Sequence, residues 1–238
     1  MIPLRDNIPS RCFPGVTVAL IVINVAVFLH ELALGPRLEA FTLRYGIVPA
    51  FYTDADLRGW AWNEAGWGAL LQPIFASMFL HGGFMHIIGN LWVLWIFGDN
   101  VEDRLGHARY LLFYLMGGVA AGLLHIATNW GSQVPTIGAS GAIAGVMGAY
   151  FVLYPRAKVL TLVPLGFILD IVALPAVIFL GFWFLLQLLS GTFGLFAGSG
   201  AGGIAFWAHI GGFVFGMLLV KRFVPRPPRL AGHWELLR

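Results

Sequence analysis

The chain has 238 residues, 59% of them hydrophobic and 11% charged, with a formal net charge of +3. Soluble domains carry about a quarter charged residues, so the composition excludes a water-soluble fold and predicts a protein solvated by the lipid bilayer. The basic residues form no patch that would bind nucleic acid, and the single cysteine, Cys12, excludes an intramolecular disulfide.

Six segments are long and apolar enough to cross a bilayer, which takes about 20 residues. The first, at 14–34, is too long for the apolar core of a cleaved signal peptide and is interpreted as a retained span. The others are predicted at 84–101, 108–128, 139–154, 173–190 and 204–222. The sequence therefore predicts an all-α integral membrane protein, a single domain over residues 1–238 built as a six-helix bundle.

The segments between the spans differ in character. Residues 35–83 form a long, tryptophan-bearing connection whose rings suit the headgroup zone. The apolar stretch 159–190 is too long for one straight span, so its first part is predicted to form a turn at the cytoplasmic surface. Residues 191–203 are rich in glycine and carry no charge, and are expected to be mobile.

The basic residues orient the chain. With the N-terminus inside, eleven of the fourteen Lys and Arg residues fall on the inner side. The inner set is Arg5, Arg11, Arg104, Arg109, Arg156, Lys158, Lys221, Arg222, Arg226, Arg229 and Arg238, and the outer set is Arg37, Arg44 and Arg58. This positive-inside bias predicts a multi-pass protein of the cell (inner) membrane with both termini in the cytoplasm.

Polar side chains inside spans are costly, so each is a candidate functional residue. Ser140 lies at the start of the span 139–154 between two glycines, Gly138 and Gly141, which allow close approach. Backbone N–H groups at a helix start lack intrahelical partners and suit an oxyanion. The alternative is an ordinary N-cap serine. The run is not the G-x-S-x-G motif of other hydrolases, because position 142 is alanine.

Three further polar residues lie at a similar depth on the outer side. His209, in the span 204–222, is either a general base or a histidine that bonds a neighbouring helix. His86 and Asn90 are four residues apart and so share a helix face. They can donate hydrogen bonds to an oxyanion or, alternatively, to a neighbouring helix. His81, just before them, is expected at the membrane interface.

Small residues recur at four-residue spacing beside Ser140 and His209. Faces of this kind let two spans pack backbone to backbone. The predicted packing residues are Gly138, Gly141 and Gly145 around Ser140, and Ala208, Gly212 and Gly216 around His209. If these two spans pair, Ser140 and His209 meet.

These motifs resemble those of the rhomboid family of intramembrane serine proteases, over most of the chain. The resemblance is carried by His86-Ile87-Ile88-Gly89-Asn90, by Gly138-Ala139-Ser140-Gly141, by Ala208-His209-Ile210-Gly211-Gly212 with Gly216, and by the stretch 97–103. It implies a six-span rhomboid-like bundle of the bacterial type. One departure is Leu57-Arg58-Gly59-Trp60, where the family often carries a Trp-Arg pair, which puts the anchoring of the first long connection in doubt.

The resemblance also implies the chemistry. Ser140 would be the nucleophile and His209 its base, while His86, Asn90 and the Ser140 backbone amide would form the oxyanion site, with no cofactor and no metal. Substrates would be single-pass or other transmembrane proteins, admitted between the spans 84–101 and 173–190 and capped by residues 191–203.

The acidic residues bear on the catalytic set. None of the eleven lies within the second, fourth or sixth span near the depth of His209. The sequence therefore predicts a Ser–His dyad without an acidic third member, in which an aromatic ring from another span orients His209.

Three other classes remain as alternatives. A non-catalytic member of the same fold that binds transmembrane segments would usually lack the serine or the histidine. A transporter or channel would need its polar path to continue to the inner side, where the spans are apolar and glycine-rich. A zinc peptidase would need an HExxH motif, which the sequence does not contain.

Overall fold

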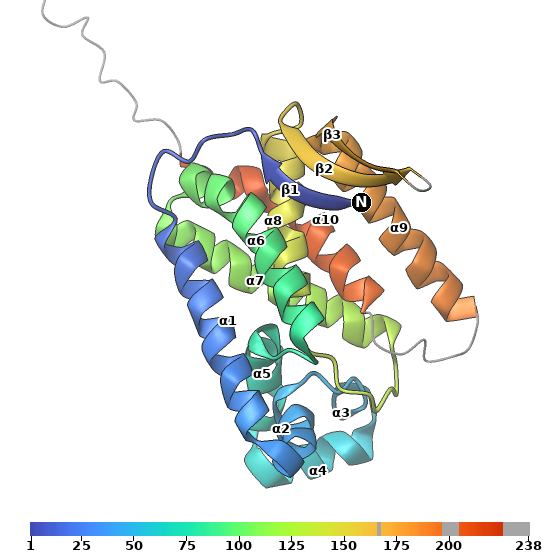
Figure 1. The fold of residues 1–238 in the computed structure, drawn as a ribbon. Coiled ribbons are helices and arrows are strands. Elements are labelled where there is room, and N and C mark those ends of the chain that lie inside the picture. The colour runs from blue at the N-terminus through green and yellow to red at the C-terminus, as the bar shows by residue number, and fades with distance from the viewer. Residues whose placement is uncertain (166–167, 197–204, 226–238) are drawn as a thin grey trace, which may run out of the picture.

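Six helices form the bundle in the computed structural model, which describes residues 1–165, 168–196 and 205–225. They are α1 (Gly15–Ala33), α6 (Phe84–Leu105), α7 (His107–Thr128), α8 (Ser140–Leu153), α9 (Ala176–Phe196) and α10 (Phe206–Phe223). Every residue of α8 from Gly141 to Tyr150 is buried, so α8 is the central helix of the bundle (Figure 1).

The helices agree with the predicted class of an all-α membrane bundle. In the described residues, α1, α7, α9 and α10 are each long and apolar enough to span a bilayer. A fifth span results if α6 is joined to the preceding helical segment 67–79, from which it is bent by 79°. The 14 residues of α8 extend only about 21 Å at 1.5 Å per residue. Because its neighbours surround it, this short helix is shielded from lipid.

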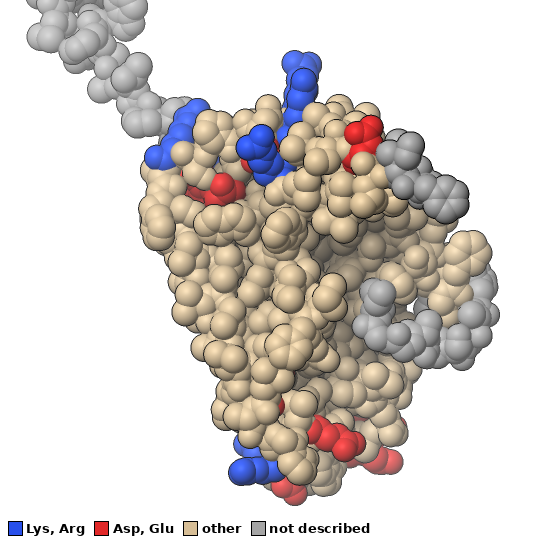
Figure 2. Space-filling model, viewed as in Figure 1, with Lys and Arg blue, Asp and Glu red and all other residues tan. Residues whose placement is uncertain are grey.

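The surface is banded in the way that a bilayer requires. On the face shown in Figure 2, acidic and basic side chains gather at the two ends of the molecule, and a broad uncharged belt separates them. Large apolar side chains of the outer helices are exposed in this structure, among them Leu29, Trp95 and Leu218. Lipid can solvate such side chains, whereas water would oppose their exposure.

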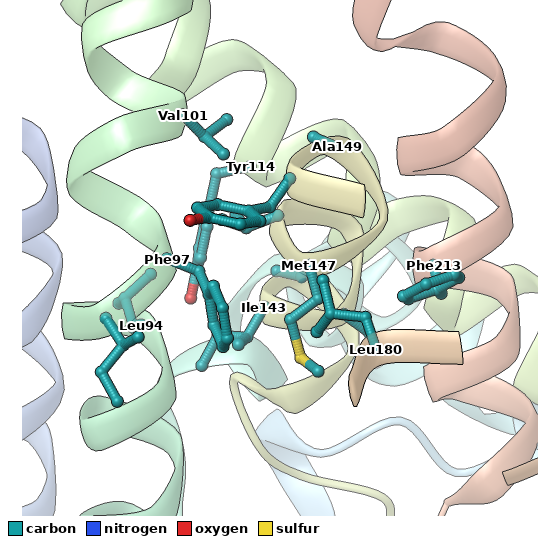
Figure 3. Close-up of a cluster of buried hydrophobic side chains, with 14 of the residues drawn as sticks. Leu94, Phe97, Val101, Tyr114, Ile143, Met147, Ala149, Leu180 and Phe213 are labelled. Carbon is teal, nitrogen blue, oxygen red and sulfur yellow. The ribbon is translucent and has the colours of Figure 1, made fainter. Parts of the chain in front are cut away.

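The centre of the bundle is a hydrophobic core to which all six of these helices contribute, and Figure 3 shows part of it. Its labelled members are Leu94, Phe97 and Val101 of α6, Tyr114 of α7, Ile143, Met147 and Ala149 of α8, Leu180 of α9 and Phe213 of α10. The rings of Phe97 and Tyr150 meet edge to face at 4.9 Å.

A small antiparallel sheet covers one end of the bundle, in the order β1 (Ile2–Asp6), β2 (Lys158–Leu165) and β3 (Ile168–Pro175). The predicted turn in this region is therefore a strand hairpin, and the pairing of the N-terminal strand with it was not foreseen. Burial alternates along β2, where Val159 and Thr161 are buried, as expected for a strand with one covered face. Strand β3 continues directly into α9.

Carboxylates hold the N-terminal segment against the bundle. Glu102 of α6 accepts hydrogen bonds from the backbone N–H groups of Val16 and Thr17, each at 2.8 Å. It thereby caps the start of α1, where the helix dipole favours negative charge. Asp6 of β1 accepts hydrogen bonds from the hydroxyl of Tyr150 and, at 3.1 Å, from the amide of Asn100.

The long connection predicted at 35–83 is mostly helical. It contains a short 3-10 helix (Gly35–Arg37), α2 (Leu38–Tyr45), α3 (Ala50–Thr53), α4 (Ala55–Ala65), α5 (Trp67–Ala76) and a second 3-10 helix (Ser77–Phe79). The backbones of Ile47 and Thr136 exchange hydrogen bonds of 2.9 and 2.8 Å, which tie the connection to the loop before α8. Arg58 donates to the carbonyl of Tyr52 at 3.1 Å. The Ile47–Thr136 pair thus anchors the connection, and the Arg58 bond holds it internally, although the Trp-Arg order is absent.

The fifth predicted span differs at both ends, because α9 begins at Ala176 and continues to Phe196. The glycine at 191 does not end the helix. A side chain at Gly191 would lie 3.3 Å from Phe206 and from Trp207 of α10, so glycine there permits close helix contact. The rest of the predicted mobile cap, from 197 to 203, lies outside the described residues.

Candidate active site

The structure brings Ser140 and His209 together at one end of α8. His209 Nε2 lies 2.8 Å from Ser140 Oγ, which is hydrogen-bonding distance. Ser140 is the first residue of α8, and the residue that caps the helix is Ala139, without a side-chain bond. The hydroxyl of Ser140 thus contacts the histidine of α10 and does not cap its own helix. Proton transfer from Ser140 to His209 is geometrically possible.

A residue that the sequence analysis did not single out contacts the other side of His209. Gln187 of α9 places Oε1 2.8 Å from His209 Nδ1. Trp183, one turn earlier on the same helix, lies with its ring centre 5.8 Å from that of His209 and provides the aromatic ring predicted beside it. A polar residue within the apolar span 173–190 was the available signal for Gln187, since such residues are expensive in a bilayer.

Small residues let α8 and α10 approach closely enough for this contact. A side-chain carbon at Gly212 would overlap the carbonyl oxygen of Gly141 and lie 3.2 Å from the nitrogen of Gly145. A side-chain carbon at Gly216 would overlap the carbonyl oxygen of Gly145 in the same way. The Cβ of Ala208 would lie 3.8 Å from a side-chain carbon at Gly141. The backbones of the two helices therefore touch over two turns.

Gly138 belongs to a different contact from the other small residues. It precedes α8 with a φ of +131°, a backbone conformation that residues with a side chain rarely adopt. A side-chain carbon there would lie 2.7 Å from His86 Nε2. Glycine at this position brings the imidazole of His86 to the backbone just before Ser140, instead of packing one helix on another.

Asn90 is bonded to a histidine of the segment that precedes α6. Its Nδ2 lies 2.9 Å from Nε2 of His81. His81 is buried inside the protein, with 3% of its surface exposed, so its side chain does not face the lipid headgroups. The cause is long-range: its backbone N–H donates to the carboxylate of Glu31 on α1, at 3.1 Å to Oε2, and its ring meets that of His86 at 5.1 Å.

A small cavity of about 30 Å³ lies beside Ser140. Its polar lining includes Ser77, His125 and Thr136, and the last two are bonded through His125 Nε2 and Thr136 Oγ1 at 2.6 Å. A cavity of this size with several polar groups is large enough for a water molecule. No local sequence pattern links these residues, since they come from three separate segments.

Comparison with known proteins gives a family match. The family model described as Rhomboid domain matches residues 68–226, which is more than half of the chain. Similar proteins include the mitochondrial rhomboid protein 1 of Saccharomyces cerevisiae, which is 30% identical over 61% of this chain and 38% of its own length. The rhomboid protease GluP of Bacillus subtilis is 41% identical over 36% of this chain and 16% of its own.

The human mitochondrial presenilin-associated rhomboid-like protein is 32% identical over 37% of this chain and 24% of its own length. The matched regions thus span less than two fifths of each of these three relatives. The likeness therefore concerns the membrane domain and not the whole of those proteins.

Proposed function

The chain belongs to the rhomboid family, and from this premise we propose that it is an intramembrane serine endopeptidase that hydrolyses peptide bonds in or near the transmembrane segments of other membrane proteins. The observation that carries the proposal is the 2.8 Å contact between Ser140 Oγ and His209 Nε2. Both side chains come from helices that touch backbone to backbone, so the pair is held rigidly. A nucleophile next to its base is the arrangement that activates serine.

The proposed first half-reaction forms an acyl-enzyme. His209 Nε2 takes the proton of the Ser140 hydroxyl while Oγ attacks the carbonyl carbon of the scissile bond. The tetrahedral intermediate collapses when the same nitrogen returns the proton to the leaving amine, which departs as the C–N bond breaks. The ester on Ser140 remains.

Attack by Ser140 is fast only if hydrogen-bond donors stabilise the negative charge that develops on the carbonyl oxygen. The free backbone N–H groups of the first turn of α8 and the imidazole of His86 are the proposed donors. Asn90 is proposed to add its second amide hydrogen, since an amide nitrogen carries two and His81 engages one. One donor of this kind contributes roughly 3–4 kcal/mol to acyl transfer.

The second half-reaction consumes water. We propose that a water molecule binds in the cavity next to the acyl-enzyme. The polar lining of this cavity, which includes Ser77, His125 and Thr136, supports the proposal. His209 would take a proton from this water as its oxygen attacks the ester carbonyl. The free acid then leaves, and Ser140 regains its proton.

The proposed setting is the cell (inner) membrane, with six spans in a single domain and both termini in the cytoplasm. Support comes from the basic residues of the inner set and from the banded surface in Figure 2. In Figure 1 the N-terminus lies at the same end of the bundle as the sheet. The candidate site would then open toward the outer half of the membrane.

The test is co-expression with a tagged single-pass membrane protein, combined with fluorophosphonate labelling of the purified enzyme. We expect cleavage and labelling with the wild type and neither with Ser140→Ala. Ser132→Ala, a change to a half-buried loop serine, is the matched control and should retain both. Equal labelling of wild type and Ser140→Ala would refute the proposal and favour a member of the fold that binds transmembrane segments without cutting them.

A further inference from the structure

Gln187 and Trp183 both contact His209 from α9, although the dyad itself is built from α8 and α10. We propose, on the basis of the protease function above, that Gln187 is a positioning residue for the general base. Its amide oxygen accepts the Nδ1 hydrogen of His209 and so keeps Nε2 free to take the proton of Ser140.

Histidine has two neutral tautomers, which differ in the ring nitrogen that carries the hydrogen. A neutral imidazole carries one N–H and one bare nitrogen, and only the bare nitrogen can act as a base. Because Nε2 faces Ser140 Oγ at 2.8 Å, the productive tautomer carries its hydrogen on Nδ1. That hydrogen needs an acceptor, since an unpaired N–H inside the protein is destabilising. Gln187 Oε1 lies 2.8 Å away and accepts it.

Trp183 adds a steric restraint to the same ring. It lies four residues before Gln187, so the two side chains leave the same face of α9. Its indole is tilted by 37° to the imidazole, with ring centres 5.8 Å apart. The hydrogen bond fixes the ring edge and the indole restricts its face, so rotation of the imidazole away from Ser140 is opposed at two points.

An amide differs from the carboxylate of a catalytic triad in one respect. It orients the ring and selects the tautomer, but it brings no negative charge to stabilise the imidazolium. A glutamine can also present its NH₂ group, which would select the opposite tautomer, whereas an ionised glutamate can only accept. Replacing Gln187 by glutamate therefore separates acceptance of the hydrogen bond from other roles of this side chain.

The location of these contacts makes the base dependent on α9. Among the four helices of the described residues that are apolar and long enough to span, α9 has the smallest buried share, 22% against 44% for α7. Phe182 and Phe193 on this helix are largely exposed. A displacement of α9 by about 1 Å would lengthen the bond to His209 beyond hydrogen-bonding range. The orientation of His209 as a base thus depends on the position of α9.

The experiment compares Gln187→Met, which keeps a similar volume without an acceptor, with Gln187→Glu, in the purified full-length enzyme. Leu186→Met, at a neighbouring exposed position of α9, is the control. We expect Gln187→Met to lower kcat by about 10- to 100-fold with KM within about twofold, since a misplaced base costs on this order. Gln187→Glu should restore kcat to within about tenfold of wild type, and the control should match wild type.

Three results would overturn the inference. They are an unchanged kcat in Gln187→Met, an effect on KM alone, and a Gln187→Glu variant as slow as the folded Gln187→Met variant. Thermal unfolding in detergent checks the fold, and Gln187→Ala provides the same comparison if the methionine variant is unstable. A wild-type enzyme that neither cleaves nor is labelled at Ser140 would instead refute the protease function, which is a separate outcome.

Discussion

Gly212→Ala tests whether the contact between α8 and α10 aligns the catalytic pair. An alanine Cβ at this position would overlap the carbonyl oxygen of Gly141 and lie 3.0 Å from its carbonyl carbon. Carbon atoms normally approach to about 3.5–4.0 Å. Neither group can rotate away, because both are backbone, so the two helices must separate by about 1 Å.

The separation of the two helices would act directly on the catalytic pair, because Gly212 lies close to it. Gly212 lies three residues after His209, and Gly141 directly follows Ser140, so the clash occurs within one turn of the pair. Adding about 1 Å to the present 2.8 Å places Ser140 Oγ and His209 Nε2 outside hydrogen-bonding range. A shift of this size lowers the rate by on the order of a hundredfold, and overpacking costs roughly 1–3 kcal/mol of stability. Gly212→Leu should abolish activity.

The assay is the second-order rate of fluorophosphonate labelling at Ser140, measured beside cleavage of a transmembrane substrate and thermal unfolding in detergent. Gly59→Ala is the control, because Gly59 is an exposed glycine of α4 with no atom within 4 Å of an added side chain. It should label at the wild-type rate. A folded Gly212→Ala enzyme that also labels at the wild-type rate would refute the packing argument.

Three further predictions concern other groups. Asn90→Ala should lower kcat more than it raises KM, because a donor to the oxyanion acts mainly in the transition state, and steady-state kinetics that show only a KM effect would remove it from that role. Gly138→Ala should impair activity by at least tenfold in the labelling assay, since a φ of +131° and the nearby ring of His86 leave no space for a methyl group. Burial raises the pKa of Asp6 above the ordinary aspartate value, so its contribution to stability is present below that value and is lost as the pH rises through the raised pKa. Asp6→Asn should therefore remove the pH dependence with which the amides of β1 are protected from hydrogen exchange. The measurement is hydrogen exchange of these amides between about pH 4 and about pH 7. The same pH dependence in the wild type and in Asp6→Asn would contradict the prediction.

The sequence predicted the class of fold for physical reasons that act locally, whereas the family was indicated by the resemblance of its motifs. Long apolar runs must be helical in lipid, because the backbone has no other partner there, and this predicted the helices near 14–34 and 108–128 to within a few residues. The glycines at 141, 145 and 212 indicated a close helix contact because only small residues permit one. Fixed spacing on helices then made Ser140 and His209 a credible pair.

Other features depend on contacts that no local pattern encodes. His81 is buried because Glu31, fifty residues earlier, accepts its backbone hydrogen bonds, and a hairpin replaces the predicted turn because β1, at the other end of the sequence, pairs with it. Gln187 looked like one polar residue in an apolar span until α9 brought it to Nδ1 of His209. The sequence by itself determined which segments form apolar helices and which small residues let helices touch, since hydropathy and side-chain volume are properties of single residues. Only the tertiary structure decided the partners of the histidines, because hydrogen bonds between distant segments depend on how whole helices are placed.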